Sequence, residues 1–451
     1  MTIPQPALPA TWRWQPLDSL SRVKVSTVDK KSYPDEVPVR LCNYTDVYYQ
    51  DVITSDLAFM EATASAEQIS RFSVQAGDVP ITKDSETSDD IGRPSYVPKD
   101  LPGVVYGYHL AIYRSFDPHY SRFIRYLFDS SLVRAELETR TPGVTRVGLS
   151  QDTLRNLRVP TPPPPVAAKI ADYLDHETAE IDAFITDQSR FIDLIEERTS
   201  VLIETIITGK QPGTTLRKES GSAWVGDIPN HWEMERISWL FSNVGSGTTP
   251  ASDDVDAFNG TIPWVTSSEL RETGVSITKK LVSDEAVRKY SALRVHPAGS
   301  LMIAMYGATI GRLGWLEVPA TVNQAICVFS DYRKGPSRYP FFALLAARRH
   351  LLTLASGGGQ PNINQDKLRS LRIPIPPEHE QTDIVRSLDK SLRDATQLVR
   401  EAKILIDLAR ERRAALITAA VTGQIDVTAR NKPAAEQIED DVAQGLHREY
   451  A

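Results

Sequence analysis

Leu157-Arg158-Val159-Pro160-Thr161-Pro162-Pro163 and Leu371-Arg372-Ile373-Pro374-Ile375-Pro376-Pro377 are two copies of one proline-rich segment, separated by nearly half of the chain. The same offset in residue number holds downstream, where Thr208-Gly209 corresponds to Thr422-Gly423. Prolines force an extended chain, and the apolar residues that follow in each copy have helical spacing. A repeat of this length indicates two copies of a whole domain plus a long helix, because solenoid units are much shorter.

The sequence upstream of each proline segment matches more weakly but in the same order. Leu8-Pro9 and Trp12 correspond to Ile228-Pro229 and Trp232 at a slightly larger offset, so the intervening segments differ by only a few insertions. The chain therefore reads as globule, helix, globule, helix. We expect an α+β fold with two mixed α/β domains in tandem, each followed by a long helix. The expected boundaries are residues 1–160 for the first domain, 161–210 for the first helix, 211–223 for a linker, 224–377 for the second domain, 378–424 for the second helix and 425–451 for a disordered tail.

The composition is typical of a globular intracellular protein. The 451 residues are 41% hydrophobic, which is enough for two separate cores. The two cysteines, Cys42 and Cys327, fall in different globules, so we expect buried thiols and no disulfide. The sequence contains no apolar run long enough to span a membrane, and its start does not resemble a signal peptide. The cytoplasm is the expected location.

The formal net charge of −7 is unevenly distributed. Residues 165–210 carry a net −6 and residues 426–451 a net −3, which leaves the two globules and their linkers at about +2. The overall acidity therefore does not exclude a polyanionic partner for the globules, and it does not require one either.

Two helices of more than 40 residues follow the proline segments. The first should run from about Val166 to Thr208 and end at Gly209, and the second from about Glu378 to Thr422 and end at Gly423. Apolar residues spaced alternately four and three apart indicate a heptad seam on each helix. The principal seam positions are Leu174, Ile181, Ile185, Ile192, Ile195, Leu202 and Ile206 on the first helix, and Leu388, Ala395, Leu398, Ala402, Leu405, Ala409 and Leu416 on the second.

The two seams differ in side-chain size. Ala395, Ala402 and Ala409 recur every seven residues, whereas the first helix presents isoleucines. Large side chains over an alanine layer favour pairing of unlike helices. Since the chain crosses a whole domain between the helices, we expect an antiparallel coiled coil in which facing residue numbers sum to about 590. The alternative is two separate amphipathic helices, each lying on its own globule.

The order of short motifs resembles the specificity subunit of type I restriction-modification enzymes, over nearly the whole chain. Each motif is weak alone, and their order together with the duplicated domain-plus-helix unit makes the resemblance specific. The motifs are Ile228-Pro229-x-x-Trp232, Ile262-Pro263-Trp264-Val265, Tyr306-Gly307-Ala308-Thr309-Ile310-Gly311, Val322-Asn323-Gln324-Ala325, Asn362-Ile363-Asn364 and the second proline segment.

The resemblance implies a division of labour. Two target-recognition domains each read one half of a split, asymmetric double-stranded DNA site, and the helices form an antiparallel coiled coil that sets the gap. The helices also dock two modification (methyltransferase) subunits and, through them, restriction (helicase-nuclease) subunits. S-adenosylmethionine, ATP and Mg²⁺ are implied for those partners, and this chain is expected to bind no cofactor and to catalyse no reaction.

The residues themselves agree with a non-catalytic chain. The sequence has no Asn-Pro-Pro-Phe-like methyltransferase motif, no GxGxxG and no P-loop, and Gly245-Ser246-Gly247-Thr248-Thr249-Pro250 lacks the Gly-Lys that a phosphate loop needs. The eight histidines show no zinc-ligand spacing. His109, which aligns with Asn323-Gln324, is interpreted as a packed polar residue.

Candidate DNA-binding residues are those in loops that combine cationic, amide or hydroxyl side chains with glycine. In the first domain they are Asn43, Tyr44, Tyr48, Lys83, Arg140 and Arg146, and in the second Ser246, Thr248, Thr249, Ser267, Ser268, Arg271, Lys279, Lys280, Tyr306, Arg312, Gln360 and Asn362.

The first domain departs from the family pattern where Lys83–Gly92 replaces Met305–Gly311, because that segment contains four acidic residues. Acidic side chains repel phosphate, so contact between this loop and a DNA backbone is not expected. An alternative function for the whole chain is a coiled-coil scaffold with two protein-interaction domains and no DNA readout.

Overall fold

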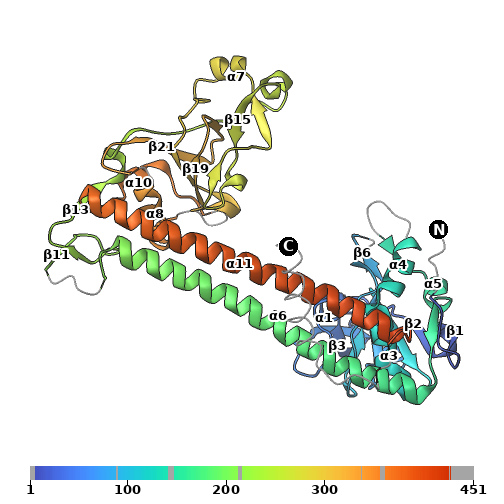
Figure 1. Cartoon of the computed structure of the whole chain (residues 1–451). Helices are drawn as coiled ribbons and strands as arrows, with labels where there is room; N and C mark the ends of the chain where they lie inside the picture. Colours follow the sequence, from blue (N-terminus) through green and yellow to red (C-terminus); the bar gives the residue numbers. More distant parts are fainter. Residues whose placement is uncertain are drawn as a thin grey trace. The chain divides into compact units, whose positions relative to one another are not determined.

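The computed structural model describes residues 6–87, 90–140, 147–211, 216–336, 338–355, 361–425 and 427. The chain divides into two compact units, residues 1–189 with 402–451 and residues 190–401. Each unit contains one α/β domain and parts of two long helices, α6 and α11, and Figure 1 labels the elements.

The first domain consists of short strands and helices followed by α6. The strands are β1 Arg13–Pro16, β2 Ser21–Val25, β3 Val37–Cys42, β4 Met60–Ala64, β5 Asp78–Thr82, β6 Asp84–Ser85, β7 Val104–Tyr106, β8 Leu110–Ser115, β9 Val147–Gly148 and β10 Arg158–Thr161. The helices are α1 Tyr44–Tyr49, α2 Ala66–Phe72, α3 Ser121–Asp129, α4 Ser131–Thr139, α5 Gln151–Arg155 and α6 Pro164–Ile207, with 3-10 turns η1 Leu17–Ser19 and η3 Pro118–Tyr120.

The second domain follows the same plan and ends in α11. The strands are β11 Arg217–Glu219, β12 Asp227–Pro229, β13 Glu233–Arg236, β14 Phe241–Ser246, β15 Ile262–Val265, β16 Gly274–Val275, β17 Lys280–Val282, β18 Leu301–Ala304, β19 Leu313–Leu316, β20 Thr321–Val322, β21 Ile326–Tyr332 and β22 Arg372–Ile375. The helices are α7 Asp284–Lys289, α8 Tyr339–Ala346, α9 Arg348–Thr353, α10 Gln365–Ser370 and α11 Glu378–Val421, with 3-10 turns η4 Ile237–Trp239, η5 Val255–Phe258, η6 Ser267–Glu269 and η7 Gly307–Thr309.

The two domains share three strands of one sheet and all three strands of another. The order β2-β8-β5 in the first domain corresponds to β14-β21-β18 in the second, where β19 and β16 extend the sheet to five strands. The order β4-β3-β7 corresponds to β17-β15-β20, and in both sheets the central strand has one antiparallel and one parallel neighbour. Helices and sheets are therefore mixed in each domain, as the sequence predicts.

The proline segments form the last strand of each domain, and their pairing has the same register in both copies. β1 pairs with β10 so that Trp14 faces Pro160, and β13 pairs with β22 so that Met234 faces Pro374. The Arg158 guanidinium donates to the Trp14 carbonyl oxygen over 3.0 Å, and the Arg372 guanidinium donates to that of Met234 over the same distance. Prolines are compatible with these strands because each pairs on one side only.

Each long helix ends against the beginning of a domain. Gly209 has φ +65° and Gly423 has φ +69°, so both helices end in a left-handed glycine. A Cβ on Gly209 would lie 2.4 Å from Pro229, and one on Gly423 would lie 2.6 Å from Pro9. The equivalence of these contacts means that α6 closes onto the second domain and α11 onto the first.

The observed helix bounds lie within two residues of those expected from proline and glycine signals. The segment expected as a linker, 211–223, contains β11, which pairs antiparallel with β12. Part of the predicted linker therefore forms a short strand, because Arg217–Glu219 gains backbone partners. Residues 428–451 of the expected tail lie outside the described residues.

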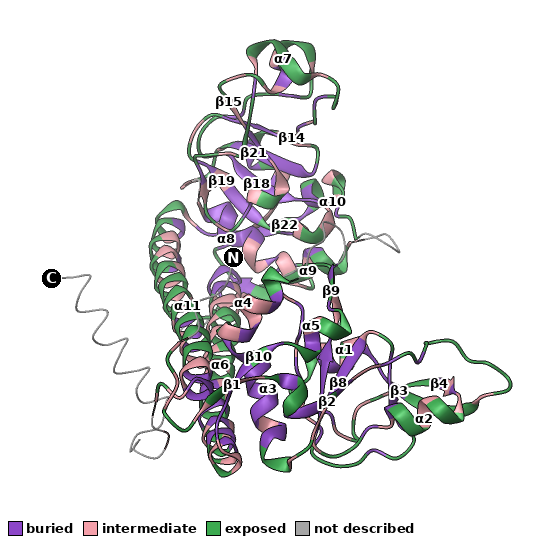
Figure 2. Cartoon of the chain, turned by 90° about the vertical axis from the view of Figure 1, so that its right-hand side faces the viewer, coloured by how far each residue is buried: buried purple, intermediate pink, exposed green. Residues whose placement is uncertain are grey.

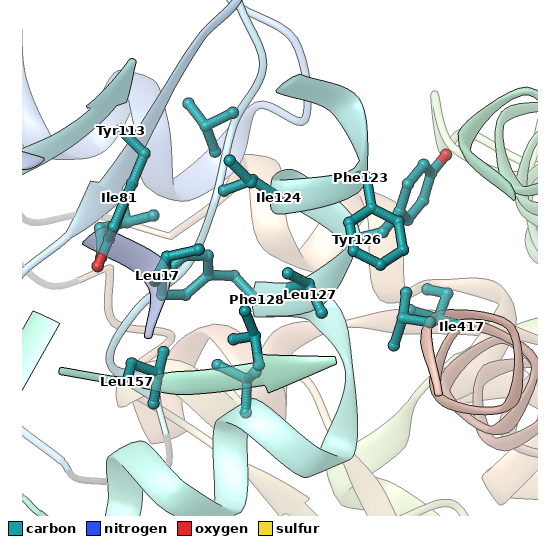
Figure 3. Packing of buried hydrophobic residues seen from close by; sticks show 14 of the residues in the cluster. Leu17, Ile81, Tyr113, Phe123, Ile124, Tyr126, Leu127, Phe128, Leu157 and Ile417 are labelled. Carbon is teal, nitrogen blue, oxygen red and sulfur yellow. The ribbon is translucent and has the colours of Figure 1, made fainter. Parts of the chain in front are cut away.

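Both long helices contribute to the core of each unit. In the first unit Leu174 and Ile181 of α6 share a cluster with Ala409 and Leu416 of α11. Figure 3 shows Ile417 of α11 beside Tyr126 and Leu127 of α3 in this core. In the second unit Ile203 and Ile206 of α6 share a cluster with Leu388 of α11. Buried residues otherwise concentrate in the sheets, and the outward faces of α6 and α11 are largely exposed (Figure 2).

Ion pairs join each domain to the helix that follows it. Arg122 of α3 contacts Asp172 over 2.6 Å and also pairs with Asp175 of α6, and Arg338 contacts Asp389 of α11 over 2.6 Å. Asp175 and Asp389 are equivalent positions of the repeat, at the same offset as the proline segments, so the repeat extends to these contacts.

Two expected seam residues are wrong. Leu202 is 37% exposed and Leu398 is 43% exposed, whereas the neighbouring Ile203 is buried and Val399 is half-buried. A straight α-helix has 3.6 residues per turn, so a strict alternation of four and three drifts off the contact face over several turns. The remaining principal seam positions, Leu174, Ile181, Ile185, Ile192, Ile195, Ile206, Leu388, Ala395, Ala402, Leu405, Ala409 and Leu416, are buried or half-buried.

Cys42 and Cys327 are both free and fully buried, and burial raises the pKa of the Cys327 thiol to about 12. Among the described residues, no helix is long and apolar enough to cross a membrane.

Candidate nucleic-acid interface

Several candidate residues lie at one equivalent turn of the two domains. This turn directly follows β3 in the first domain and β15 in the second. In the first domain Asn43 caps α1, and Asp46 accepts the Asn43 N–H over 2.7 Å. In the second domain Thr266 caps η6, and Glu269 accepts the Thr266 N–H over the same distance. Counting from these caps, Tyr44 corresponds to Ser267 and Tyr48 to Arg271. The two turns therefore share a capping box and present different side chains from it.

Asn43 itself is a structural residue. It is 8% exposed, and its side chain and backbone complete the cap of α1. Its polar atoms thus already have partners inside the domain, and contact between Asn43 and DNA stays a prediction. Arg140 is exposed and pairs with Glu136 one helical turn earlier, and its contact with DNA also stays a prediction. Arg146 lies outside the described residues.

Tyr44 and Tyr48 line an open hollow of about 920 Å³ in the first domain. Their rings stack with centroids 5.4 Å apart, and the Tyr44 ring meets His109 edge-on at 6.5 Å. Acidic residues from the segment after β5, namely Asp84, Glu86 and Asp90, line the same hollow. We call this site the acidic hollow. It combines flat aromatic faces with carboxylates that can only accept hydrogen bonds.

An ion pair with Lys83 and a hydrogen-bond contact with His109 fix the carboxylate of Asp84. Lys83 donates to it over 2.7 Å and the His109 ring nitrogen lies 2.8 Å away. Burial alone would raise the pKa of the Asp84 carboxyl, but the bonds from Lys83 and His109 hold it below its usual value. Asp84 is therefore charged at neutral pH. The Lys83 ammonium is paired with this carboxylate in the structure.

Asp90 and Arg93 hold the second tyrosine. The Tyr48 hydroxyl donates to Asp90, and this hydrogen bond, together with burial, raises the pKa of Tyr48. The Arg93 guanidinium lies over the Tyr48 ring at 5.5 Å. Tyr48 thus presents a fixed ring edge and remains a neutral phenol.

In the second domain, three candidate residues line one smaller hollow of about 420 Å³. Ser268, Arg271 and Lys279 surround it, and all three are exposed. The Glu269 carboxylate accepts the Lys279 backbone N–H over 2.8 Å, so the turn and the β16–β17 loop are held together. We call this site the basic hollow. Hydroxyl, guanidinium and ammonium groups are the donors that base edges and phosphates accept.

A second group of candidates lies around Trp264. The Trp264 indole N–H donates to the Thr248 carbonyl oxygen over 3.1 Å, and the Thr249 hydroxyl donates to Gln324. The Lys280 ammonium lies over the Phe258 ring at 5.0 Å, where it is held by a cation–π contact. Ser246 ends β14 and is half-buried, and Ser267 of the neighbouring turn is also half-buried.

Tyr306 and Asn362 form a β-bridge, and Arg312 lies 3.8 Å from Glu272. Asn362 and Arg312 are exposed and Tyr306 is half-buried. The structure therefore brings Tyr306 and Asn362 together, as well as Ser268, Arg271 and Lys279. Gln360 lies outside the described residues.

The sequence alignment missed two features of the first domain. The His109 carbonyl oxygen accepts the Lys83 N–H over 3.0 Å, as that of Ala325 accepts the Met305 N–H over 2.8 Å. His109 therefore corresponds to Ala325, not to Asn323-Gln324, and its ring lines the acidic hollow. The acids of this segment were set aside as incompatible with phosphate, whereas Asp84 lies at the position of Tyr306. The sequence signal that could have indicated this site is an aspartate at the end of a strand, Asp84, together with the tyrosines after another strand, Tyr44 and Tyr48.

Within the described ranges, no group of three or more His, Cys, Asp or Glu side chains could hold a metal ion.

Comparisons with known proteins identify relatives of this arrangement. Residues 229–407 match the family model described as the type I restriction modification DNA specificity domain. The specificity subunit of the type I restriction enzyme EcoR124I/EcoR124II from Escherichia coli is 29% identical over 213 residues, which is 45% of this chain and 51% of that subunit. The chain thus spans about half the length of this curated relative.

Other relatives match over nearly the whole chain. The putative type I restriction enzyme MjaX specificity subunit from Methanocaldococcus jannaschii is 20% identical over 432 residues, covering 93% of this chain and 95% of that one. A chain from a solved structure on complex assembly of the type I R-M system superposes with a TM-score of 0.67 at 17% identity, covering 93% of this chain and 100% of that chain. This superposition indicates a shared fold for both copies of the repeat.

Proposed function

We propose a function from one premise: the chain belongs to the family of type I restriction-modification specificity subunits. It acts as the DNA specificity subunit of such a complex. Each domain binds one half of a split, asymmetric site in double-stranded DNA, and the protein itself performs no chemistry. S-adenosylmethionine, ATP and Mg²⁺ would be bound by partner subunits.

One observation supports this proposal above the others. The two domains share sheet order, strand register and capping boxes, yet at equivalent positions one presents Tyr44, Tyr48 and Asp84 and the other Ser267, Arg271 and Tyr306. A duplicated framework with different reading side chains suits a target whose two halves differ in sequence.

Binding to duplex DNA tests the proposal against a protein scaffold. The purified chain, alone and with its modification subunit, would be titrated with duplexes that carry the methylated motif mapped in the host. Tight binding that depends on the motif supports the specificity role. Equal affinity for all duplexes, or none, contradicts it, and methyl transfer by this chain alone would contradict the non-catalytic role.

We further propose that α6 and α11 form one antiparallel coiled coil that sets the gap between the half-sites. Within the first unit Asp182 of α6 contacts Arg413 of α11 over 3.0 Å, so facing residues sum to 595 there, close to the expected 590. Facing segments can therefore be removed together without breaking the seam.

Deleting Ile185–Phe191 with Val399–Leu405 removes one heptad from each helix. At 1.5 Å per residue this shortens the helix pair by roughly 10 Å, or about three base pairs. The mapped motif should keep both half-sites and shorten its gap, or binding should be lost because three base pairs also rotate the DNA. Either single deletion should be more harmful because it misaligns the seam. An unchanged gap in the double deletion contradicts the proposal.

The exposed apolar side chains of α6 and α11 suit the docking of two copies of one modification subunit. Leu194 is 54% exposed and Leu408 is 39% exposed, and they occupy equivalent positions of the repeat. Phe191 and Val201 flank Leu194, and Ile404 flanks Leu408, all at least 43% exposed. Solvent-exposed apolar stripes on helices that already have a seam are typical of a further helix partner.

Leu194→Asp and Leu408→Asp should each reduce the modification subunits that copurify from two per chain to one, and the double variant should abolish copurification. Ser189→Asp adds the same charge at another exposed position of α6 and should leave two. Mass measurement of the purified complexes decides the matter. Full stoichiometry in the double variant contradicts this docking surface.

A further inference from the structure

Four arginines converge on one hollow of about 550 Å³ in the second unit. Arg271, Arg312, Arg348 and Arg349 come from the domain, and Thr199 and Ser200 of α6 lie among the residues opposite. The lining also includes the acids Glu196 and Glu272, so its formal charge is +2. We call this site the arginine hollow.

The arginines differ in how they are held. Arg348 donates through Nε to the Gly311 carbonyl oxygen over 2.9 Å and pairs with Glu272. Arg312 lies 3.8 Å from the second oxygen of Glu272. Among the described residues, neither Arg271 nor Arg349 has an ion pair or side-chain hydrogen bond. Two positive groups are therefore fixed by one carboxylate, and two exposed ones are available to a ligand.

The backbone at Glu272 has an unusual conformation. Its φ is +59°, one of two positive values for non-glycine residues in the described chain. Glycine is the usual residue in this conformation, because a side chain there is strained. Glu272 also donates its N–H to the Leu313 carbonyl oxygen over 2.8 Å, which aims its carboxylate between Arg312 and Arg348. Strain retained at a residue that positions two guanidinium groups is a feature of binding sites.

We propose that the arginine hollow binds a phosphate group, and that its occupant is a phosphate of the DNA backbone. In this form the inference rests on the proposed function. Planar guanidinium groups bind the oxygens of a phosphate in pairs, which suits a phosphate better than a single halide.

Arg271 connects this hollow with the reading site. The same side chain lines the arginine hollow and the basic hollow, where Ser268 and Lys279 also lie. A backbone that leaves a base edge in the basic hollow therefore meets the arginine hollow next. The strand would be fixed against α6 and α11 as well as against the second domain, without any dependence on base sequence. A free phosphate-bearing ligand would have the same chemistry, and the experiment separates the two sources.

Arg349→Ala is the principal test, because Arg349 does not line the basic hollow. Arg271→Ala/Arg349→Ala is the stronger variant. Arg393→Ala and Arg393→Ala/Arg400→Ala are matched controls, since these exposed α11 arginines lie outside the hollow and remove the same charge. Affinity for duplexes with and without the mapped motif is measured with the assembled complex between 50 and 200 mM salt, roughly the range over which phosphate contacts dominate. The full chain is titrated separately with inorganic pyrophosphate by calorimetry.

Loss of one phosphate contact should reduce the slope of log K against log salt by about 0.9 and weaken both duplexes equally, by roughly tenfold. The controls should change neither quantity. If the slope is unchanged but the wild-type chain binds pyrophosphate and Arg349→Ala does not, the hollow binds a free phosphate ligand. An unchanged slope without pyrophosphate binding, or equal losses in the controls, overturns the inference. Failure of the wild-type complex to bind any duplex would contradict the proposed function, and the pyrophosphate titration would still test the hollow.

Discussion

The segments around Lys83 in the first domain and Met305 in the second form the same main-chain hydrogen bonds. The side chains that follow differ in charge and type. The Leu149 N–H donates to the Lys83 carbonyl oxygen over 2.8 Å, and the Ile363 N–H donates to that of Met305 over the same distance. One residue further, the first domain has Asp84 beside two tyrosines, whereas the second has Tyr306 followed by Gly307. Backbone pairing tolerates this exchange because it does not involve the side chains.

The same comparison holds in the cores. Asp78 of β5 is fully buried, and both of its carboxylate oxygens accept from Arg114 of β8 over 2.7 Å. The corresponding residues of the second domain are Ser300 and Ser330, whose hydroxyls lie 2.9 Å apart. One framework thus accommodates an ion pair in one copy and a neutral hydrogen bond in the other. Differences between the domains should therefore appear in stability and in specificity, while the fold is retained.

Arg114→Ala should have the largest effect on stability. It leaves the Asp78 carboxylate buried without its counter-charge, which costs about 3–5 kcal/mol of the unfolding free energy. Ser330→Ala leaves no buried charge unpaired and removes only the neutral contacts of the Ser330 hydroxyl with Ser300 and His296, so it should cost about 1 kcal/mol. Denaturant unfolding followed by hydrogen exchange in each unit would measure both. Equal losses would mean that the two cores are energetically alike.

The helix ends should respond equally in the two copies. Gly209→Ala and Gly423→Ala each place a methyl group against a proline and force a left-handed residue, at a cost of about 2–4 kcal/mol. Gly103 and Gly299 also have positive φ, but a Cβ there would meet no atom within 4 Å. Alanine at these two control positions should cost only about 1 kcal/mol. Thermal unfolding of the four variants decides whether both closures matter equally.

Asp84→Asn should alter one half of the recognised site. The carboxylate only accepts hydrogen bonds, so it suits the amino group of cytosine or adenine, whereas an amide can also donate. We expect discrimination at one base pair of the first half-site to relax by about 1–3 kcal/mol. Asp56→Asn removes an exposed carboxylate elsewhere in the first domain and should change nothing. A changed second half-site in the Asp84 variant would refute separate reading.

In the intact chain, the second domain should lose stability in mild acid and the first domain should not. Burial, with a smaller contribution from Arg294, lowers the pKa of His296, whose ring lies 3.4 Å from the Ser330 hydroxyl. Because the folded protein binds this proton less readily than the unfolded chain, stability is present above pH about 6.5 and decreases below it, by at most about 1.4 kcal/mol per pH unit. His296→Gln should remove this dependence in the second unit. Hydrogen exchange at pH 5 and 7 would show it.

The sequence predicted the features that depend on local signals. Proline and glycine define the ends of α6 and α11, and these lie within two residues of expectation. The predicted seam positions Leu202 and Leu398 are exposed, because small errors in the assumed helical period accumulate along 44 residues.

The sites were less predictable because they combine distant segments. Tyr44 and Arg271 were chosen by residue type, and only the shared capping boxes show that they belong to equivalent turns. Asp84 meets His109 across 25 residues, and Arg348 meets Glu272 across 76. Asn43 has a side chain of the type that contacts DNA bases, but in this fold it caps the N-terminus of α1. Such roles depend on which polar atoms the fold already satisfies.

The central claim is that two equivalent frameworks read two different half-sites independently. Replacing residues 1–155 with the corresponding domain of a relative, and mapping the methylated motif of the parent and the chimaera in a host with active modification, tests it most directly. We expect a split, non-palindromic parent motif and a chimaera in which one half changes while the other half and the gap stay the same. A palindromic parent motif, or a chimaera with both halves changed, would contradict the account.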